Sequence, residues 1–133
     1  MIDHLSIGVR RLAGAKQFYD AALAPLGGRC LSEDKSSLGY GSEGAVFWLY
    51  AVDNPVPADG RAGLHLCFRA PTRQSVDAFH AAALAAGGAD AGAPGPRPEY
   101  TQPFYGAFVL DPDGFKVEAV CRQDHGSDAR VAQ

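Results

Sequence analysis

Two histidines and one glutamate have the residue types and positions that a metal site requires. His4 lies in "DHLSIGV" and His65 opens "HLCFRA", and both stretches alternate apolar and non-apolar residues. In a β-strand this alternation puts each imidazole on the face opposite the apolar one. Glu118, in "FKVEAVC", also falls on the non-apolar face of a predicted strand. Two neutral imidazoles and a carboxylate form a facial ligand set for a divalent metal and leave positions open for substrate.

The chain repeats itself, and the repeat relates these residues to one another. "HLSIGV" from His4 aligns with "HLCFRA" from His65, at an offset of 61 residues. "GAVFWLY" aligns with "GFKVEAV" at an offset of 70 residues, which places Trp48 over Glu118. Repeats of this length indicate two copies of one supersecondary unit. If a pseudo-twofold axis relates the copies, we expect equivalent positions to converge near that axis.

Each ligand taken alone has a simpler explanation. A lone strand histidine is usually a packed or solvated side chain, and a glutamate near a strand end is usually a solvated edge charge. The joint placement of His4, His65 and Glu118 on matching strand faces is what favours a metal site. The metal is expected to be divalent: Fe, Mn, Ni or Zn.

The elements that would position these residues follow one order twice, strand–helix–strands. Apolar residues at spacings of three and four predict helices over 12–25 and 73–86, with Thr72 as the cap of the second. "DPDG" at 111–114 predicts a tight turn, and the proline-rich segment 91–103 predicts a long loop. The predicted strands cover 3–9, 29–32, 37–41, 44–52, 65–70, 104–110 and 115–121.

We expect the 133 residues to form one domain with two modules. The first module covers about 1–53 and the second about 64–121, with a linker over about 54–63. A polar tail, 122–133, follows the last strand.

The composition is that of an ordinary globular protein, with 47% hydrophobic and 20% charged residues. A net charge of −3 without a basic cluster argues against nucleic acid as a partner. No apolar run is long enough for a membrane span, and no signal-peptide pattern opens the chain. Cys30, Cys67 and Cys121 show no paired spacing, which predicts free thiols and a cytoplasmic location.

Three segments together resemble the vicinal-oxygen-chelate superfamily, which includes glyoxalase I, extradiol dioxygenases and bleomycin resistance proteins. They are "DHLSIGVRRLAGAKQFYDAALAPLGG", "GLHLCFRA" and "DPDGFKVEAV", and the resemblance covers about residues 1–121. It implies an α+β fold of two βαβββ modules in pseudo-twofold pairing, whose sheets form an open cup. It also implies a metal inside the cup, a small-molecule substrate and a homodimer.

Carried over residue by residue, the resemblance assigns the metal ligands to His4, His65 and Glu118. Glyoxalase I has a fourth, acidic ligand where this chain has Trp48, so ordinary glyoxalase I activity is not expected, and neither is methylmalonyl-CoA epimerase activity. The three-ligand set is similar to those of extradiol dioxygenases and fosfomycin thiol transferases. The thiol transferases have a tyrosine where this chain has Phe108.

Other residues are expected to line the pocket. Trp48 would form an apolar wall beside the metal, with Tyr50 further along the same strand face. The proline-rich loop leads to Tyr100, Phe104 and Tyr105, which could contact a planar substrate, as could Phe108. Tyr105 and Glu118 are the candidates for catalytic roles. Dimer contacts or plain loop packing explain these aromatic residues equally well. Arg69 could meet an anionic substrate or form a salt bridge at the rim of the cup.

The sequence thus predicts a metal-dependent enzyme acting on a small molecule with vicinal oxygens, of lyase/isomerase or dioxygenase type. One alternative is a small-molecule-binding protein without catalysis, like the bleomycin resistance proteins. A fosfomycin-type thiol transferase and a structural-metal protein without turnover are further alternatives.

Overall fold

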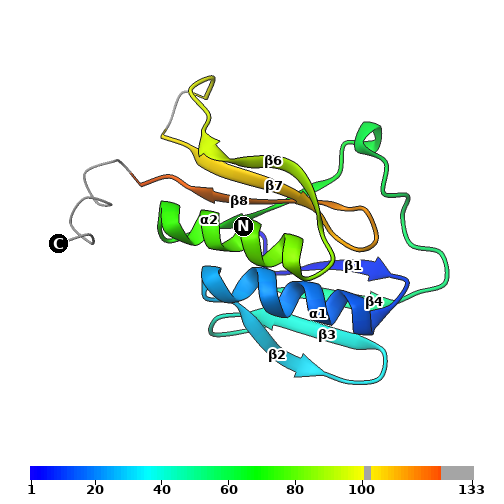
Figure 1. Ribbon diagram of the computed structural model, residues 1–133. Helices are drawn as coiled ribbons and strands as arrows, with labels where there is room; N and C mark the ends of the chain where they lie inside the picture. Colours follow the sequence, from blue (N-terminus) through cyan, green and yellow to red (C-terminus); the bar gives the residue numbers. More distant parts are fainter. Residues whose placement is uncertain (101–102, 124–133) are drawn as a thin grey trace.

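The computed structural model describes residues 1–100 and 103–123, and these residues form two four-stranded mixed sheets with two α-helices (Figure 1). The strand orders are β1-β4-β3-β2 and β5-β8-β7-β6, so each sheet comes from one half of the chain. The predicted α+β fold of two βαβββ modules is therefore confirmed. The strands are β1 (Leu5–Val9), β2 (Arg29–Glu33), β3 (Ser37–Gly41), β4 (Phe47–Ala51), β5 (His65–Arg69), β6 (Ala89–Pro96), β7 (Tyr105–Leu110) and β8 (Lys116–Cys121).

The two helices begin and end close to the predicted positions. α1 spans Leu12–Leu23 and continues as the 3-10 turn η1 (Ala24–Leu26), which ends at Gly27 with φ +86°. α2 spans Arg73–Ala85, and Thr72 caps it as predicted, because its hydroxyl accepts a hydrogen bond from the Ser75 amide. A second 3-10 turn, η2 (Gly60–Ala62), interrupts the predicted linker. No described helix is long and apolar enough to cross a membrane.

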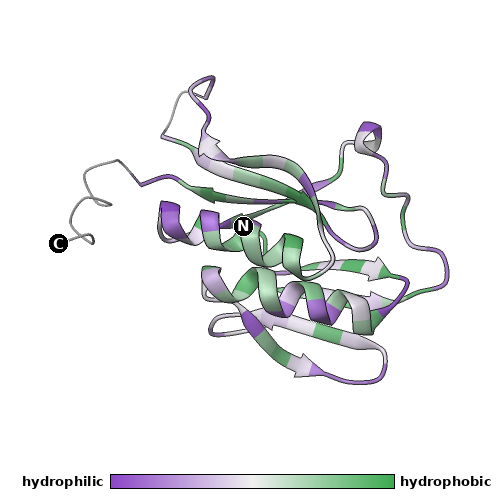
Figure 2. Ribbon diagram, in the orientation of Figure 1, coloured by the Kyte–Doolittle hydropathy of each residue, from purple (hydrophilic) through white to green (hydrophobic). Residues whose placement is uncertain are grey.

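Both helices pack on the same side of the sheets and lie next to each other (Figure 1). The hydropathy colouring shows hydrophobic and hydrophilic residues alternating along each helix, as amphipathic helices require (Figure 2). One core joins both halves of the chain, and it includes Phe18 and Leu49 from the first half and Phe79 and Val117 from the second. The opposite faces of the sheets carry the candidate site residues.

A buried hydrogen bond connects the two modules. The Tyr19 hydroxyl of α1 donates to an Asp111 carboxylate oxygen at 2.6 Å, and Asp111 opens the predicted 111–114 turn. The other Asp111 oxygen accepts from the amides of Asp113 and Phe115, which fixes the turn, and Gly114 completes it with φ +91°. The "FY" and "DPDG" segments therefore contact each other across the modules.

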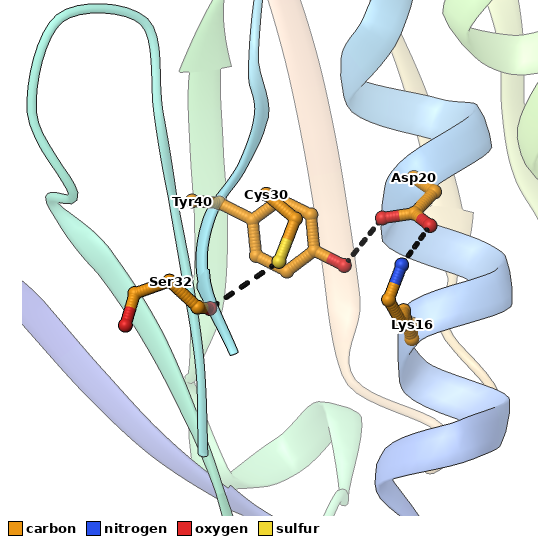
Figure 3. Close-up of polar contacts among 5 residues, drawn as sticks. All are labelled: Lys16, Asp20, Cys30, Ser32 and Tyr40. Carbon is orange, nitrogen blue, oxygen red and sulfur yellow. Dashed lines mark hydrogen bonds and ion pairs between the residues drawn. The ribbon is translucent and has the colours of Figure 1, made fainter. Parts of the chain in front are cut away.

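Within the first module, a polar contact anchors β3 to α1 (Figure 3). The buried Tyr40 donates its hydroxyl to Asp20 at 2.8 Å, and Lys16 donates to the other oxygen of the same carboxylate at 2.7 Å. Burial and the Asp20 carboxylate raise the pKa of Tyr40 well above its usual range. The contact holds one face of β3 against the helix, so that the other face is presented toward Trp48.

The predicted loop 91–103 is partly wrong, because the structure forms β6 over Ala89–Pro96. β6 lies at the edge of its sheet and pairs only with β7 among the described strands, with register shifts on both sides of Gly92. An edge strand with bulges tolerates Pro94 and Pro96, because proline lacks the amide that a central strand needs. The predicted polar tail lies outside the described residues from 124 onward.

Candidate functional site

His65 and Glu118 form the centre of the site. β5 and β8 run parallel, and their register places Cys67 opposite Glu118, with His65 two residues earlier. The His65 Nε2 atom lies 3.7 Å from Glu118 Oε2. Donor atoms at this separation can share one metal ion, since each bond to the ion measures about 2.0–2.2 Å. These two residues fit a metal site.

The Glu118 carboxylate is held in a low-dielectric position. The residue is 4% exposed, whereas 51% of the His65 side chain is exposed. Burial raises the pKa of Glu118, while a hydrogen bond from the Cys67 thiol and the charge of His65 oppose the rise. The pKa of Cys67 is raised to about 12, mainly by burial and then by the Glu118 charge. A carboxylate in such a place gains most from a cation that binds beside it.

His4 does not join this pair within one chain. It precedes β1, with 56% of its side chain exposed, and its Nδ1 lies 2.6 Å from an Asp3 oxygen. Among the described residues, no three His, Cys, Asp or Glu side chains gather as a metal site. Phe47 pairs with Leu5 at the start of β1, and its ring contacts Phe68 near the end of β5.

His65 begins β5, whereas the Phe47–Phe68 contact joins the start of β1 to the end of β5, which separates the two histidines along the strands. The expectation that the pseudo-twofold axis brings His4 onto His65 is therefore not met within one chain.

Trp48 and Tyr50 lie on the corresponding face of the first module. Ser6 pairs with Trp48 as Cys67 pairs with Glu118, which is the equivalence that the two sequence offsets predict. The two rings are stacked at 6.4 Å between centroids. Trp48 lies directly over Gly39, where an added Cβ would approach the indole to 2.7 Å. Trp48 thus forms an apolar wall on its own sheet face.

Aromatic rings with cations above them surround Glu118. Phe108 pairs with Glu118 across β7 and β8, and Lys116 Nζ lies 4.6 Å from its ring centroid. Phe104 covers Gly106, and the Arg122 guanidinium lies 5.0 Å from the Phe104 centroid. Tyr100 packs on Phe104 at 4.5 Å.

Two predicted pocket residues lie elsewhere. The Tyr105 hydroxyl donates to Asp77 of α2 at 2.7 Å, and Arg73 lies over its ring. Tyr105 pairs with the buried Cys121, so strand alternation turns it toward the helix and away from Glu118. The Arg69 side chain lines a separate hollow of about 300 Å³ near Phe47 and Phe68.

Sequence reasoning assigned no role to Cys67, Lys116 and Arg122. Alternation already placed Cys67 with His65 and Lys116 with Glu118, and this was the available signal for those two. The contact of Arg122 with Phe104 depends on the fold of the segment before β7, which no periodicity encodes.

Comparisons with known proteins agree with this fold. Residues 1–119 match the family described as the Glyoxalase/Bleomycin resistance protein/Dioxygenase superfamily. A glyoxalase/bleomycin resistance protein from Albidiferax ferrireducens T118 is 35% identical, with a TM-score of 0.81, covering 90% of this chain and 98% of that one. A putative glyoxalase from Bacillus halodurans is 25% identical, with a TM-score of 0.70, covering 91% and 95%.

A glyoxalase I variant from Zea mays shares the fold at 21% identity, with a TM-score of 0.65 over 94% of this chain and 47% of that one. No curated protein matches the sequence.

Proposed function

We propose that this chain, which belongs to the Glyoxalase/Bleomycin resistance protein/Dioxygenase superfamily, is a metal-dependent enzyme acting on a small molecule with vicinal oxygens. The observation that carries the proposal is the His65–Glu118 pair, with 3.7 Å between Nε2 and Oε2 and a buried carboxylate. Fe, Mn, Ni and Zn all suit two imidazoles and one carboxylate. The unpaired thiols of Cys30, Cys67 and Cys121 support a cytoplasmic location.

The third ligand, His4, comes in this proposal from a second copy of the chain. Its exposure leaves it accessible to a partner, and Asp3 holds its Nδ1. A carboxylate on one ring nitrogen fixes the tautomer and leaves Nε2 free to bind a metal. In a twofold dimer, each site would combine His4 of one protomer with His65 and Glu118 of the other.

His4, His65 and Glu118 would hold a divalent ion, which when bound would supply Lewis-acid stabilisation of negative charge on a substrate oxygen. Glu118 would take up and return a proton at a carboxylate oxygen, as a carboxylate beside the reacting oxygens can do. Trp48, with Tyr50 stacked beside it, would exclude water from the reacting oxygens. With Trp48 in place of a fourth acidic ligand, we propose isomerase/lyase or dioxygenase chemistry other than that of ordinary glyoxalase I.

A second candidate is a binding protein without catalysis. It is favoured by the aromatic residues on the same sheet faces, Trp48 and Tyr50 in one module and Phe104 and Phe108 in the other. Such a protein would bind an aromatic ligand equally well after metal removal, which separates the two candidates.

The metal content of the purified protein tests the first proposal. We expect wild-type protein, offered Fe, Mn, Ni or Zn, to retain about one ion per chain, and His65→Ala and Glu118→Ala to retain none. His80→Ala is the matched control, because His80 bonds to Asp90 on α2's side of the sheet. Wild-type protein without bound metal, or retention undiminished in His65→Ala, would contradict the proposal.

Mixing two inactive variants tests the origin of the third ligand. His4→Ala and Glu118→Ala should each bind no metal, while unfolding and refolding them together restores about a quarter of the wild-type content. Half of randomly paired dimers are mixed, and each mixed dimer rebuilds one of its two sites. If circular dichroism shows folded chains and the mixture still binds no metal, His4 is not supplied by the partner.

A further inference from the structure

Two cations flank Glu118 on its sheet face. Strand alternation puts Lys116, Glu118 and Val120 on this face of β8, and Arg122 follows at the end of the strand. Lys116 therefore lies two residues before Glu118 on this face, and Arg122 lies four residues after it. Neither forms an ion pair with a carboxylate of the described residues.

Aromatic rings hold both cations in place. Lys116 Nζ lies 4.6 Å from the Phe108 centroid, and the Arg122 guanidinium lies 5.0 Å from the Phe104 centroid. Tyr100 packs against Phe104 and extends this apolar surface. A guanidinium stacked on a ring keeps its N–H groups available at its edges, where a carboxylate can bind them in a bidentate manner.

The local charge contrasts with that of the whole chain. The protein carries a net charge of −3, yet around Glu118 the basic residues outnumber the carboxylates. Arg97 is a third basic residue there, since its guanidinium lies 5.8 Å from the Phe108 centroid. Arg97 donates to the Ala93 carbonyl, so Lys116 and Arg122 are the cations best able to bind a ligand. A metal ion bound to Glu118 would neutralise its carboxylate and leave the face more positive still.

We propose that the substrate of this site carries a carboxylate group, which Arg122 binds, on an apolar body that contacts Phe104. The inference rests on the proposed function, because it takes the Glu118 face as the substrate site. It adds a substrate class that the ligand set alone does not specify: small organic acids, as opposed to neutral diols or aldehydes. In the competing explanation, the two cations only balance the charge of Glu118.

Binding of benzoate and its neutral isostere benzamide distinguishes these explanations. We expect benzoate to bind wild-type protein at least about tenfold more tightly than benzamide, measured by calorimetric titration. Arg122→Gln should weaken benzoate binding by about tenfold, whereas Lys116→Gln, at the other end of the strand, should weaken it less, and neither should change benzamide binding. Arg29→Gln and Lys35→Gln are the matched controls, because both residues are exposed in the first module.

The titration is run on the protein as purified and after treatment with a chelator. Charge-selective binding that depends on Arg122 in both samples supports the inference, even where the metal assay refutes the proposed enzyme. Three results would overturn the inference even where metal is bound. They are equal affinity for benzoate and benzamide, no binding of benzoate, and an equal loss of benzoate affinity in the control variants. The two proposals therefore fail separately.

Discussion

Trp48 is the only tryptophan of the chain, and its position depends on the absence of a side chain at Gly39. The indole lies where a Cβ on Gly39 would approach three of its ring atoms to 2.7–3.0 Å. Gly39 is thus the complement of Trp48: a small residue on β3 makes room for a large one on β4. This pairing sets the wall that the first module presents to a ligand.

Gly39→Ala should displace the Trp48 ring and destabilise the fold by about 1–3 kcal/mol, as overpacking does. Because Trp48 is the only tryptophan, its fluorescence emission reports the displacement directly, and thermal unfolding reports the stability. Gly14→Ala is the control with the opposite expected sign. Gly14 lies in α1 with nothing near its Cβ position, so alanine there should stabilise by about 0.5–1 kcal/mol. Unchanged fluorescence in Gly39→Ala would contradict the assigned packing.

At the scale of elements, the contact between α1 and the β7–β8 turn couples the modules. Tyr19 is fully buried, and burial together with the charge of Asp111 raises its pKa well above the usual range. The pKa of Asp111 is also raised by burial, although the hydrogen bonds that it accepts oppose this. The Tyr19 hydroxyl therefore stays protonated and donates to Asp111 at all ordinary pH values.

Tyr19→Phe should lower the free energy of unfolding by about 1–3 kcal/mol, because it leaves a buried carboxylate with one donor fewer. The measurement is urea unfolding followed by circular dichroism, with the slope m unchanged if only this bond is lost. Tyr50→Phe is the matched control, since Tyr50 is exposed. A loss in Tyr19→Phe no larger than that in Tyr50→Phe would show that the bond contributes little.

The elements also show what sequence patterns could and could not predict. The repeat correctly related Trp48 to Glu118, because strand register preserves sequence offsets. β6 was missed, since its glycines and prolines are turn formers locally and only pairing with β7 makes them a strand. Tyr105 was predicted to contact the substrate, yet its hydroxyl bonds to Asp77 of α2, because the loop before β7 gives no alternation from which its face could be predicted.

At the scale of the whole molecule, strand alternation predicted that His65 and Glu118 share a sheet face, but it could not predict where His4 lies relative to them. Strand alternation is local, so it fixes the faces of His65 and Glu118 reliably. Whether His4 meets them depends on how two modules, and two chains, are arranged, and no local pattern specifies that. The grouping of three ligands is therefore a property of the assembly in our proposal.

This assembly predicts that metal retention depends on protein concentration. Dilution of wild-type protein below the dissociation constant of the dimer should release the metal, because each site then loses His4. Equilibrium dialysis at several protein concentrations, with sedimentation measured in parallel, checks this. A single polypeptide of two linked copies should keep its metal at every dilution. Metal retained by a sedimenting monomer would contradict the shared site.

The division of the strands between two sheets has a further consequence. Among the described residues, no hydrogen-bonded strand pair joins the first half to the second, and the halves meet through a common core and the Tyr19–Asp111 bond. Each half therefore depends on the other to cover its share of the hydrophobic core. The segment 54–63 acts as a tether that raises the effective concentration of one half near the other. A chain cut there should reassemble from its two fragments, as a heterodimer does.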